Sequence, residues 1–363
     1  MGKRKRFAVV LGTRPEFIKL SAFLQRAPRL GIDLLTLHTG QHFDENMSSI
    51  FFRELGLPAP SVTLKAPHGQ SSASLGDMIA GTTEVMVRER ANLDGVIVLG
   101  DTYSTLAGGL AASRTKLPLI HIEAGLRSND RRMPEELNRI IIDNMSELLF
   151  TTEEAGTNNL THEGITQERI HFVGNIGVES FELIRSLIEA RKTHEHLGFE
   201  RRGYRVATIH RHEHTHDPKI LERICVFLSQ LAKRKPIVFP LHPATRAKLK
   251  EYGLEHRLSA TIIEPQGYLD FMNLVMNSAG VITDSGGIQE ETSHLGIPCC
   301  TVRDTTERPV TIELGSNKLF PPASLDDAAF SRIEAHLART DFTAGTIPLW
   351  DEHVSKRIVE YLL

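Results

Sequence analysis

Long apolar segments, cysteine clusters and a charge excess of one sign are all missing from this chain of 363 residues. No apolar run approaches the roughly 20 residues that a membrane-spanning helix requires. The three cysteines, Cys225, Cys299 and Cys300, lie in apolar stretches without metal-ligand spacing. Lysine plus arginine number 42 against 45 aspartate plus glutamate, so no net field favours nucleic acid or a membrane surface. We expect a cytoplasmic protein whose partner is a small molecule.

The basic N-terminal segment, residues 3–6, runs into a predicted strand and has no apolar signal-peptide core behind it. We therefore expect a plain solvated terminus. Internal repeats and low-complexity segments are also missing. The length exceeds one compact core and suits two domains of roughly 150 to 190 residues with a cleft between them.

Short β-branched runs alternate with amphipathic stretches along the whole chain, which predicts doubly wound parallel sheets. The expected strands are residues 7–11, 33–38, 96–99, 117–122, 147–151, 170–173, 205–209, 237–241, 260–263, 280–283 and 298–302. The fold class is therefore α/β, with two Rossmann-like domains. We expect residues 1–173 plus 350–363 to form the N-terminal domain and 174–349 the C-terminal one, with the amphipathic last segment crossing back to the first.

Ligands of such sheets bind beyond the carboxyl ends of the strands, where this chain is rich in polar residues. After the first predicted strand, Thr13 and Glu16 have capping-box spacing and Pro15 suits the first helical turn. Arg14 adds a cation where the helix start offers free N–H groups, a favourable place for phosphate, and Lys19 follows about one turn later. A simple structural helix start is the alternative.

Three carboxylates, Asp101, Glu123 and Glu135, stand after neighbouring strands in the first half of the chain. A single acid in this position is commonly an N-cap. Gathered like charges raise pKa values, however, and so suit acid/base chemistry. We expect these three to meet at one site.

Histidines follow two strands of the second half, in the segments 210–214 and 242–246. A metal site is one interpretation, but the set lacks the partners and spacing of catalytic metal centres. A phosphate-facing histidine with arginine needs no metal, so we expect none and no cofactor.

The strongest local signal is the segment 283–291, in which a strand ends and Ser285, Gly286 and Gly287 open a helix. A helix start without side chains lets backbone N–H groups approach a pyrophosphate. Glu291 would lie two turns in, where it could accept bonds from ribose hydroxyls. The alternative is an ordinary capped turn. A second polar helix entry, residues 303–309, could face the same site.

In their order and approximate spacing, these residues resemble the non-hydrolysing UDP-N-acetylglucosamine 2-epimerase family from Gly12 to Pro309. The resemblance implies the two-domain glycosyltransferase-B fold, a homodimer, and a UDP-sugar held between the domains.

The resemblance also implies roles for single residues. Arg14 and His210 would contact the phosphates, the segment 285–287 would cradle them, and Glu291 would bind the ribose. Asp101, Glu123 and Glu135 would form the acid/base set, with His210 also placed among the catalytic residues. Tyr268 and Phe271 match the uridine-side segment, although alone they would indicate core aromatics. Lys19, Arg139 and Arg308 match substrate-binding positions at or near the site.

The chain departs from the family pattern at a few positions. Tyr103 stands where Asn or Thr is usual, and His212 and His214 flank Glu213 where a small residue and Asn are common. Members activated by their own substrate carry Gln-His before Arg-Glu, whereas Gln41-His42 precedes Phe43-Asp44 here. The local sequence is nearer to diacetamido-sugar uronate epimerases or archaeal-type members.

The family's activity inverts carbon 2 of a UDP-N-acetylamino sugar, here UDP-N-acetylglucosamine to UDP-N-acetylmannosamine, through a 2-acetamidoglucal. UDP-2,3-diacetamido-2,3-dideoxy-glucuronate is the alternative substrate. The chain could instead be a UDP-sugar glycosyltransferase, a hydrolysing relative or a non-catalytic nucleotide-sugar sensor. A dehydrogenase is disfavoured because no Gly-x-Gly-x-x-Gly follows the first strand.

Overall fold

The computed structural model describes residues 4–41, 52, 55–64 and 72–363. Lys3 of the basic terminus and the segment His42–Asp44 lie outside these residues. The chain divides into two compact units, residues 1–184 with 348–363, and residues 185–347. The division lies within helix α7 (Ile176–Glu189), a little after the joint expected at residue 174.

A seven-stranded parallel sheet forms the centre of the first unit, in the order β3-β2-β1-β4-β5-β6-β7. Its strands are β1 (Arg6–Leu11), β2 (Asp33–His38), β3 (Val62–Thr63), β4 (Gly95–Leu99), β5 (Leu119–Ala124), β6 (Leu148–Thr151) and β7 (Ile170–Phe172). The strand order reverses between β1 and β4, which is where doubly wound sheets bind ligands.

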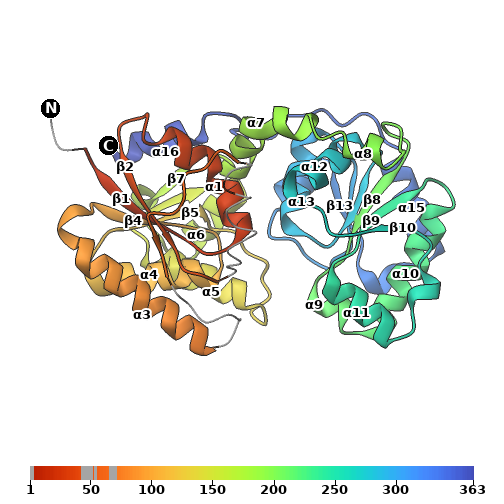
Figure 1. The fold of residues 1–363 in the computed structure, drawn as a ribbon, viewed down its shortest axis with the longest axis horizontal. Helices are drawn as coiled ribbons and strands as arrows, with labels where there is room; N and C mark the ends of the chain where they lie inside the picture. The colour runs from red at the N-terminus through yellow and green to blue at the C-terminus, as the bar shows by residue number, and fades with distance from the viewer. Residues whose placement is uncertain (1–3, 42–51, 53–54, 65–71) are drawn as a thin grey trace. The chain divides into compact units, whose positions relative to one another are not determined.

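Helices cover both faces of this sheet, with α3, α4 and α5 packed side by side on one face and α1 against α16 on the other (Figure 1). The helices are α1 (Arg14–Arg26), α3 (Ser72–Glu89), α4 (Tyr103–Thr115), α5 (Pro134–Met145), α6 (Glu154–His162) and α16 (Val354–Leu362), with 3₁₀ turns η1 (Arg90–Asn92) and η2 (Gln167–Arg169). Buried residues of β1, β2 and β4 pack with α3 and α4 in one apolar cluster.

The final segment of the chain returns to the first unit. The indole Nε1 of Trp350 donates to the carbonyl of Thr152 at 2.9 Å. Lys5 Nζ donates to the carbonyl of Leu362 at 2.8 Å, so the segment is held near both of its ends. Val354, Ile358 and Leu362 are buried at helical spacing, which explains why α16 packs as an amphipathic helix.

The second unit contains a six-stranded parallel sheet in the order β10-β9-β8-β11-β12-β13. Its strands are β8 (Arg205–Thr208), β9 (Ile237–Pro240), β10 (Thr261–Ile263), β11 (Val281–Thr283), β12 (Cys299–Thr301) and β13 (Asn317–Leu319). Numbered within the unit, this is the order of the first six strands of the other sheet. The switch point therefore lies between β8 and β11.

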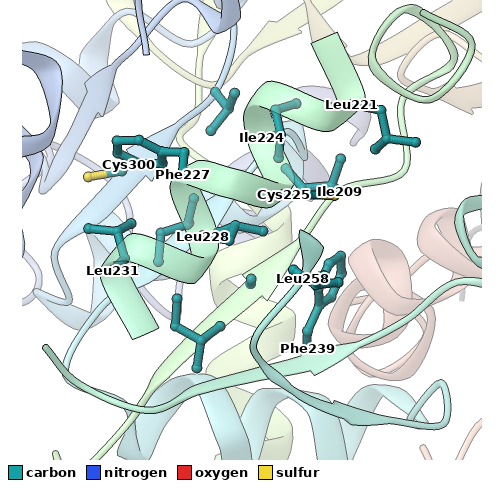
Figure 2. Close-up of a cluster of buried hydrophobic side chains, with 14 of the residues drawn as sticks. Ile209, Leu221, Ile224, Cys225, Phe227, Leu228, Leu231, Phe239, Leu258 and Cys300 are labelled. Carbon is teal, nitrogen blue, oxygen red and sulfur yellow. The ribbon is translucent and has the colours of Figure 1, made fainter. Parts of the chain in front are cut away.

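The helices of the second unit again lie on both faces of the sheet (Figure 1). They are α8 (Thr193–His196), α9 (His212–Thr215), α10 (Pro218–Ala232), α11 (Pro243–Glu251), α12 (Tyr268–Asn277), α13 (Gly286–Leu295), α14 (Val310–Glu313) and α15 (Asp327–Leu337), with 3₁₀ turns η3 (Glu255–Arg257) and η4 (Pro322–Ser324). Asp217 is the N-cap residue of α10, and its carboxylate accepts from the N–H groups of Lys219 and Ile220. Figure 2 shows its apolar side chains packed with Phe239 of β9 and Cys300 of β12.

The two parallel-sheet units confirm the predicted α/β class, and all eleven predicted strands occur. Strands β3 and β13 were not predicted. No described helix is long and apolar enough to cross a membrane.

Candidate active site

The carboxylate of Glu16 joins the two turns at the switch point of the first unit. Its Oε2 accepts from the N–H groups of Gly12 and Thr13 at 2.9 and 2.7 Å, as the capping-box spacing predicts. Its Oε1 accepts from the Thr102 hydroxyl, 2.8 Å away at the start of α4. Burial raises the pKa of Glu16 against the opposing effect of these hydrogen bonds. Glu16 therefore holds the ends of β1 and β4 in a fixed relation.

The two cations of the first helix differ in their surroundings. Arg14 is exposed in the first turn of α1. Lys19 contacts Glu123 of β5, and its Nζ lies 2.7 Å from each carboxylate oxygen. The Glu123 side chain is only 3% exposed, so this ion pair compensates a buried negative charge.

Glu123 lies at a bulge at the end of β5. The pairing register of β5 with β6 shifts between Ile122 and Ala124, and Glu123 has a φ of 68°. A bulge with a non-glycine residue in this region is strained and re-aims the side chain. Gly125 follows with a φ of 79°, and a Cβ there would lie 2.3 Å from the carbonyl oxygen of Gly156. The turn therefore accepts no larger residue at position 125.

A buried network of hydrogen bonds and ion pairs holds the ends of β4 and β5 in place. His121 Nδ1 lies 2.6 Å from Oδ1 of Asp143, and its Nε2 lies 2.8 Å from the carbonyl of Gly100. Arg127 Nη1 lies 2.7 Å from the other Asp143 oxygen. Burial alone would raise the pKa of Asp143, but His121 and Arg127 lower it. The ionised carboxylate thus fixes the backbone that carries Asp101 and Glu123.

Asp101 is held by helix α5. Arg139 donates from Nε and Nη2 to Oδ2 of Asp101 at 2.9 and 2.7 Å, and from Nη1 to Glu136 at 2.6 Å. The Asp101 side chain is 30% exposed, whereas that of Arg139 is 3% exposed. The carbonyl of Asp101 accepts from Asn138 at 2.8 Å. Glu135, in the first turn of α5, is exposed.

In the second unit, the buried carboxylate of Asp284 organises the turn after β8. The N–H groups of His210 and Arg211 each donate to its Oδ2 at 2.9 Å. Nδ1 of His210 lies 2.9 Å from Oδ1, and Nδ1 of His214 lies 3.0 Å from Oδ2. Burial alone would raise the pKa of Asp284, but its bonds from His210 and His214 hold that pKa well below its usual range. Although desolvation opposes it, Asp284 raises the pKa of His210.

Helix α13 begins at Gly286, two residues after Asp284. Ser285 is its N-cap residue, and Gly286 and Gly287 form its first turn. A Cβ on Gly287 would meet no atom within 4 Å, so open space lies in front of this turn. The helix start thus offers backbone N–H groups to a negatively charged group.

Charged side chains of the second polar helix entry lie beside this turn. Arg308 Nε is 2.6 Å from Glu290, and Arg303 Nη1 is 2.8 Å from Glu307. Arg211 Nη2 is 3.7 Å from Glu307. A Cβ on Gly286 would lie 3.6 Å from Nη1 of Arg308, which places that guanidinium against the glycine turn.

The residues expected on the nucleoside side lie on two packed helices. The Tyr268 hydroxyl, at the start of α12, donates to Oε1 of Glu291 on α13 at 2.6 Å. Burial, followed by the nearby Glu291 carboxylate, raises the pKa of Tyr268 well above its usual range. Phe271 is half-buried one turn further along α12.

The predicted residues are divided between the two units of the chain. The first contains Arg14, Lys19, Asp101, Glu123, Glu135 and Arg139, and the second contains His210, Tyr268, Phe271, Ser285, Gly286, Gly287, Glu291 and Arg308. The sequence patterns assigned no role to Asp284, although its place after β11, next to β8, could have indicated one. Among the described residues, no group of three or more His, Cys, Asp or Glu could hold a metal ion.

Two of the three predicted carboxylates in the first unit, Asp101 and Glu123, lie at the ends of neighbouring strands and are each paired with a cation, which suits proton transfer near carbon. The second has N–H groups, a histidine and arginines, which suit stabilisation of a leaving phosphate.

The family model described as UDP-N-acetylglucosamine 2-epimerase matches residues 24–363. The chain belongs to the UDP-N-acetylglucosamine 2-epimerase family. Two relatives extend this result. A UDP-N-acetylglucosamine 2-epimerase of Methanococcus maripaludis is 42% identical over 325 residues, covering 86% of this chain and 87% of the relative. The UDP-2,3-diacetamido-2,3-dideoxy-D-glucuronate 2-epimerase of Pseudomonas aeruginosa is 38% identical over 358 residues, covering 97% and 98%.

Solved structures agree with the sequence comparison. The UDP-GlcNAc 2-epimerase of Methanocaldococcus jannaschii, in complex with UDP-GlcNAc and UDP, superimposes with a TM-score of 0.87 at 36% identity, covering 98% of this chain and 99% of that one. This 2-epimerase is thus an isomerase with the predicted glycosyltransferase-B-like fold.

Proposed function

We propose that this 2-epimerase interconverts UDP-N-acetylglucosamine and UDP-N-acetylmannosamine without hydrolysis and without a metal or other cofactor. The observation that carries the proposal is the pair Asp101 and Glu123. Each carboxylate lies at the end of one of two neighbouring strands and is held by a cation, Arg139 or Lys19. Inversion at carbon requires proton removal on one face and proton return on the other, which two separate carboxylates can provide.

The proton on carbon 2 of a pyranose is not acidic, because no carbonyl is conjugated with it. Direct deprotonation would leave an unstabilised carbanion. We propose instead that a base takes this proton while the bond from carbon 1 to the UDP oxygen breaks. The C–H electron pair forms the double bond of 2-acetamidoglucal, and UDP leaves with the electrons of the broken bond. Proton return to the other face of carbon 2 and re-addition of UDP complete the inversion.

Departure of UDP places negative charge on the β-phosphate. We assign its stabilisation to Arg14, His210 and the glycine turn of Ser285, Gly286 and Gly287. Loss of one preorganised donor of this kind typically costs about 10²- to 10³-fold in rate. Arg308 would complete the phosphate site beside the glycine turn. Tyr268 and Glu291, which are hydrogen-bonded to each other, would bind the nucleoside.

Acid/base work is assigned to Asp101 and Glu123, with Glu135 as a third, solvent-exposed group. The resemblance placed Lys19 and Arg139 at substrate-binding positions, but their contacts indicate a further role. Because Lys19 pairs with Glu123 and Arg139 with Asp101, we propose that both cations orient carboxylates in addition to any contact with substrate.

The test is proton NMR of EDTA-treated enzyme with UDP-N-acetylglucosamine in deuterated water. We expect deuterium at carbon 2 of both epimers and a growing signal of the manno epimer, without free sugar. Free N-acetylmannosamine would indicate a hydrolysing enzyme, and turnover that needs an added acceptor would indicate a glycosyltransferase. UDP binding without exchange of any UDP-sugar would indicate a nucleotide-sugar sensor.

A second candidate substrate is the UDP-2,3-diacetamido-sugar uronate. It is favoured by the Pseudomonas aeruginosa relative, whose similarity spans 97% of this chain. The same exchange experiment with both UDP-sugars decides between them. Exchange confined to the uronate would reassign the substrate but leave the elimination chemistry in place.

We also propose that the protein acts as a homodimer in the cytoplasm. Leu137 and Ile141, four residues apart on α5, are 44% and 42% exposed and form an apolar strip suited to an interface. Sedimentation measures the oligomeric state of the wild type and of Ile141→Lys, and we expect a dimer for the wild type and a monomer for the variant. A monomeric wild type would contradict the proposal.

A further inference from the structure

A second histidine, His214, contacts the same buried carboxylate as His210. Its Nδ1 lies 3.0 Å from Oδ2 of Asp284, while Nδ1 of His210 lies 2.9 Å from Oδ1. Only 5% of the His214 side chain is exposed, compared with 47% for His210. The two rings share one anchor, but only His210 is accessible enough to meet a ligand.

Three donors meet at Oδ2 of Asp284. Besides His214, the N–H groups of His210 and Arg211 each donate to this oxygen at 2.9 Å. Oδ1 accepts none of these three bonds and lies 2.9 Å from Nδ1 of His210. Because a buried carboxylate without donors would rotate or take up a proton, the bonds at Oδ2 determine where Oδ1 points.

The 2.9 Å contact between Oδ1 of Asp284 and Nδ1 of His210 favours one tautomer of the imidazole. A neutral ring that donates its Nδ1–H to a carboxylate keeps Nε2 as the free nitrogen, and protonation adds a donor there. Nε2 of His210 is therefore the atom available to a phosphate. At metal sites, removal of the outer partner that orients a histidine typically costs about 10- to 100-fold, and we expect a loss of the same order here.

We propose that His214 is a positioning residue for His210: by donating to Oδ2 of Asp284, it holds the carboxylate so that Oδ1 fixes the ring and tautomer of His210. The inference rests on the proposed function, in which His210 faces the leaving phosphate. It requires a donor at position 214 but not an imidazole. An asparagine, which the resemblance gives as common there, would serve.

The charged groups around His210 are known from its contacts. Asp284 comes from the turn before α13, and Arg211 and Glu213 come from the turn that begins α9. Glu307 lies behind Arg211 at 3.7 Å. Substitution of His214 leaves all four in place, so a change at His210 can be attributed to the carboxylate that the two histidines share.

The experiment compares wild type with His214→Asn, His214→Leu and the matched control His212→Asn. His212 lies on the same short helix but is exposed and stacks on His216 instead of contacting Asp284. Nitrogen-detected NMR of the histidine rings reports the tautomer and titration of His210 in the free protein. Initial rates between about pH 6 and about pH 9 report kcat and KM.

We expect His214→Asn and His212→Asn to keep the Nδ1–H tautomer of His210 and kcat within about threefold of wild type. His214→Leu should give mixed tautomers and lose about 10- to 100-fold in kcat, with a smaller change in KM. Wild-type kcat and tautomer in His214→Leu would overturn the proposal. So would an equal loss in His214→Asn and His214→Leu with an unaffected control.

If His214→Leu does not fold, the wild type and His214→Asn still decide the question. An Nε2–H tautomer of neutral His210 in either protein would overturn the proposal. The NMR comparison needs no substrate. An enzyme inactive on every UDP-sugar tested would contradict the proposed function. The tautomer of His210 would still test whether His214 positions that ring.

Discussion

The ammonium nitrogen of Lys19 lies 2.7 Å from both carboxylate oxygens of Glu123, a residue 104 positions later in the chain. The two side chains differ in burial, since that of Glu123 is 3% exposed and that of Lys19 is 21% exposed. Loss of the lysine would remove a positive charge beside a carboxylate that is almost fully buried, whereas loss of the carboxylate would remove a partner of an ammonium that is partly exposed to water. The pair is therefore asymmetric in its effect on stability.

We expect Lys19→Met to lower the free energy of unfolding by about 3 kcal/mol, because breaking a buried ion pair from one side is costly. Glu123→Gln should cost less, and the double variant should recover part of the loss. Urea unfolding measures all three, and Lys356→Met, which removes an exposed lysine, should change stability by less than about 0.5 kcal/mol. Equal losses in both single variants would contradict this asymmetry.

Asp101→Asn tests the acid/base assignment. The amide keeps the shape of the side chain but cannot accept the proton, so hydrogen exchange at carbon 2 should fall by at least about 10²-fold. UDP affinity, measured by calorimetry, should stay within about threefold of wild type. The exposed Asp341→Asn is the control and should change neither quantity. Unchanged turnover in Asp101→Asn would remove Asp101 from the mechanism.

Gly287→Ala separates binding from folding at the start of α13. The added Cβ meets no protein atom within 4 Å, so the fold should be unaffected or gain up to about 1 kcal/mol from helix propensity. The same methyl group would occupy space that a phosphate needs, and UDP binding should weaken at least about tenfold. Gly76→Ala in α3, another unhindered helical glycine, is the control for stability. Wild-type UDP affinity in Gly287→Ala would place the phosphates elsewhere.

The pair His210 and Asp284 predicts a pH dependence of stability. Because the pKa of His210 is raised above 6.5 in the fold, its contribution is complete below about pH 6.5 and is lost as the pH rises through the folded value. Because the pKa of Asp284 is lowered, its own contribution is present above about pH 4 and lost only in stronger acid. The stability advantage of wild type over His210→Gln should thus be largest near pH 5 to 6 and narrow toward pH 9. Urea unfolding across this range measures it, and a constant difference would contradict the ion pair.

Strand positions could be predicted because buried β-branched runs leave a local signal, whereas β3 and β13 could not. Those two strands are two and three residues long, and most of their residues are not buried. The order in which strands join the sheets is likewise tertiary information. It nevertheless explains why the polar residues after β1, β4, β8 and β11 matter, since these strands flank the two switch points.

The sequence predicts which positions contribute to the candidate site, but it does not predict which side chains contact one another there. The glycine turn at Gly286 and Gly287 is visible in the sequence because the required residue types are adjacent. Arg139 donates to Asp101 from 38 positions further along the chain. The sequence around either residue gives no sign that the two side chains are in contact. Asp284 was missed for the same reason, because its donors lie 70 to 74 positions away.

The return of residues 348–363 to the first unit has a consequence for synthesis on the ribosome. The chain leaves that unit at residue 184, completes the whole second unit, and only then supplies Trp350 and α16. The second unit has its own sheet and core, so it can fold while the first still lacks the helix that packs on α1. A nascent chain halted before residue 348 would therefore carry a finished second unit and an exposed apolar face on α1, which makes this stage the most vulnerable to aggregation.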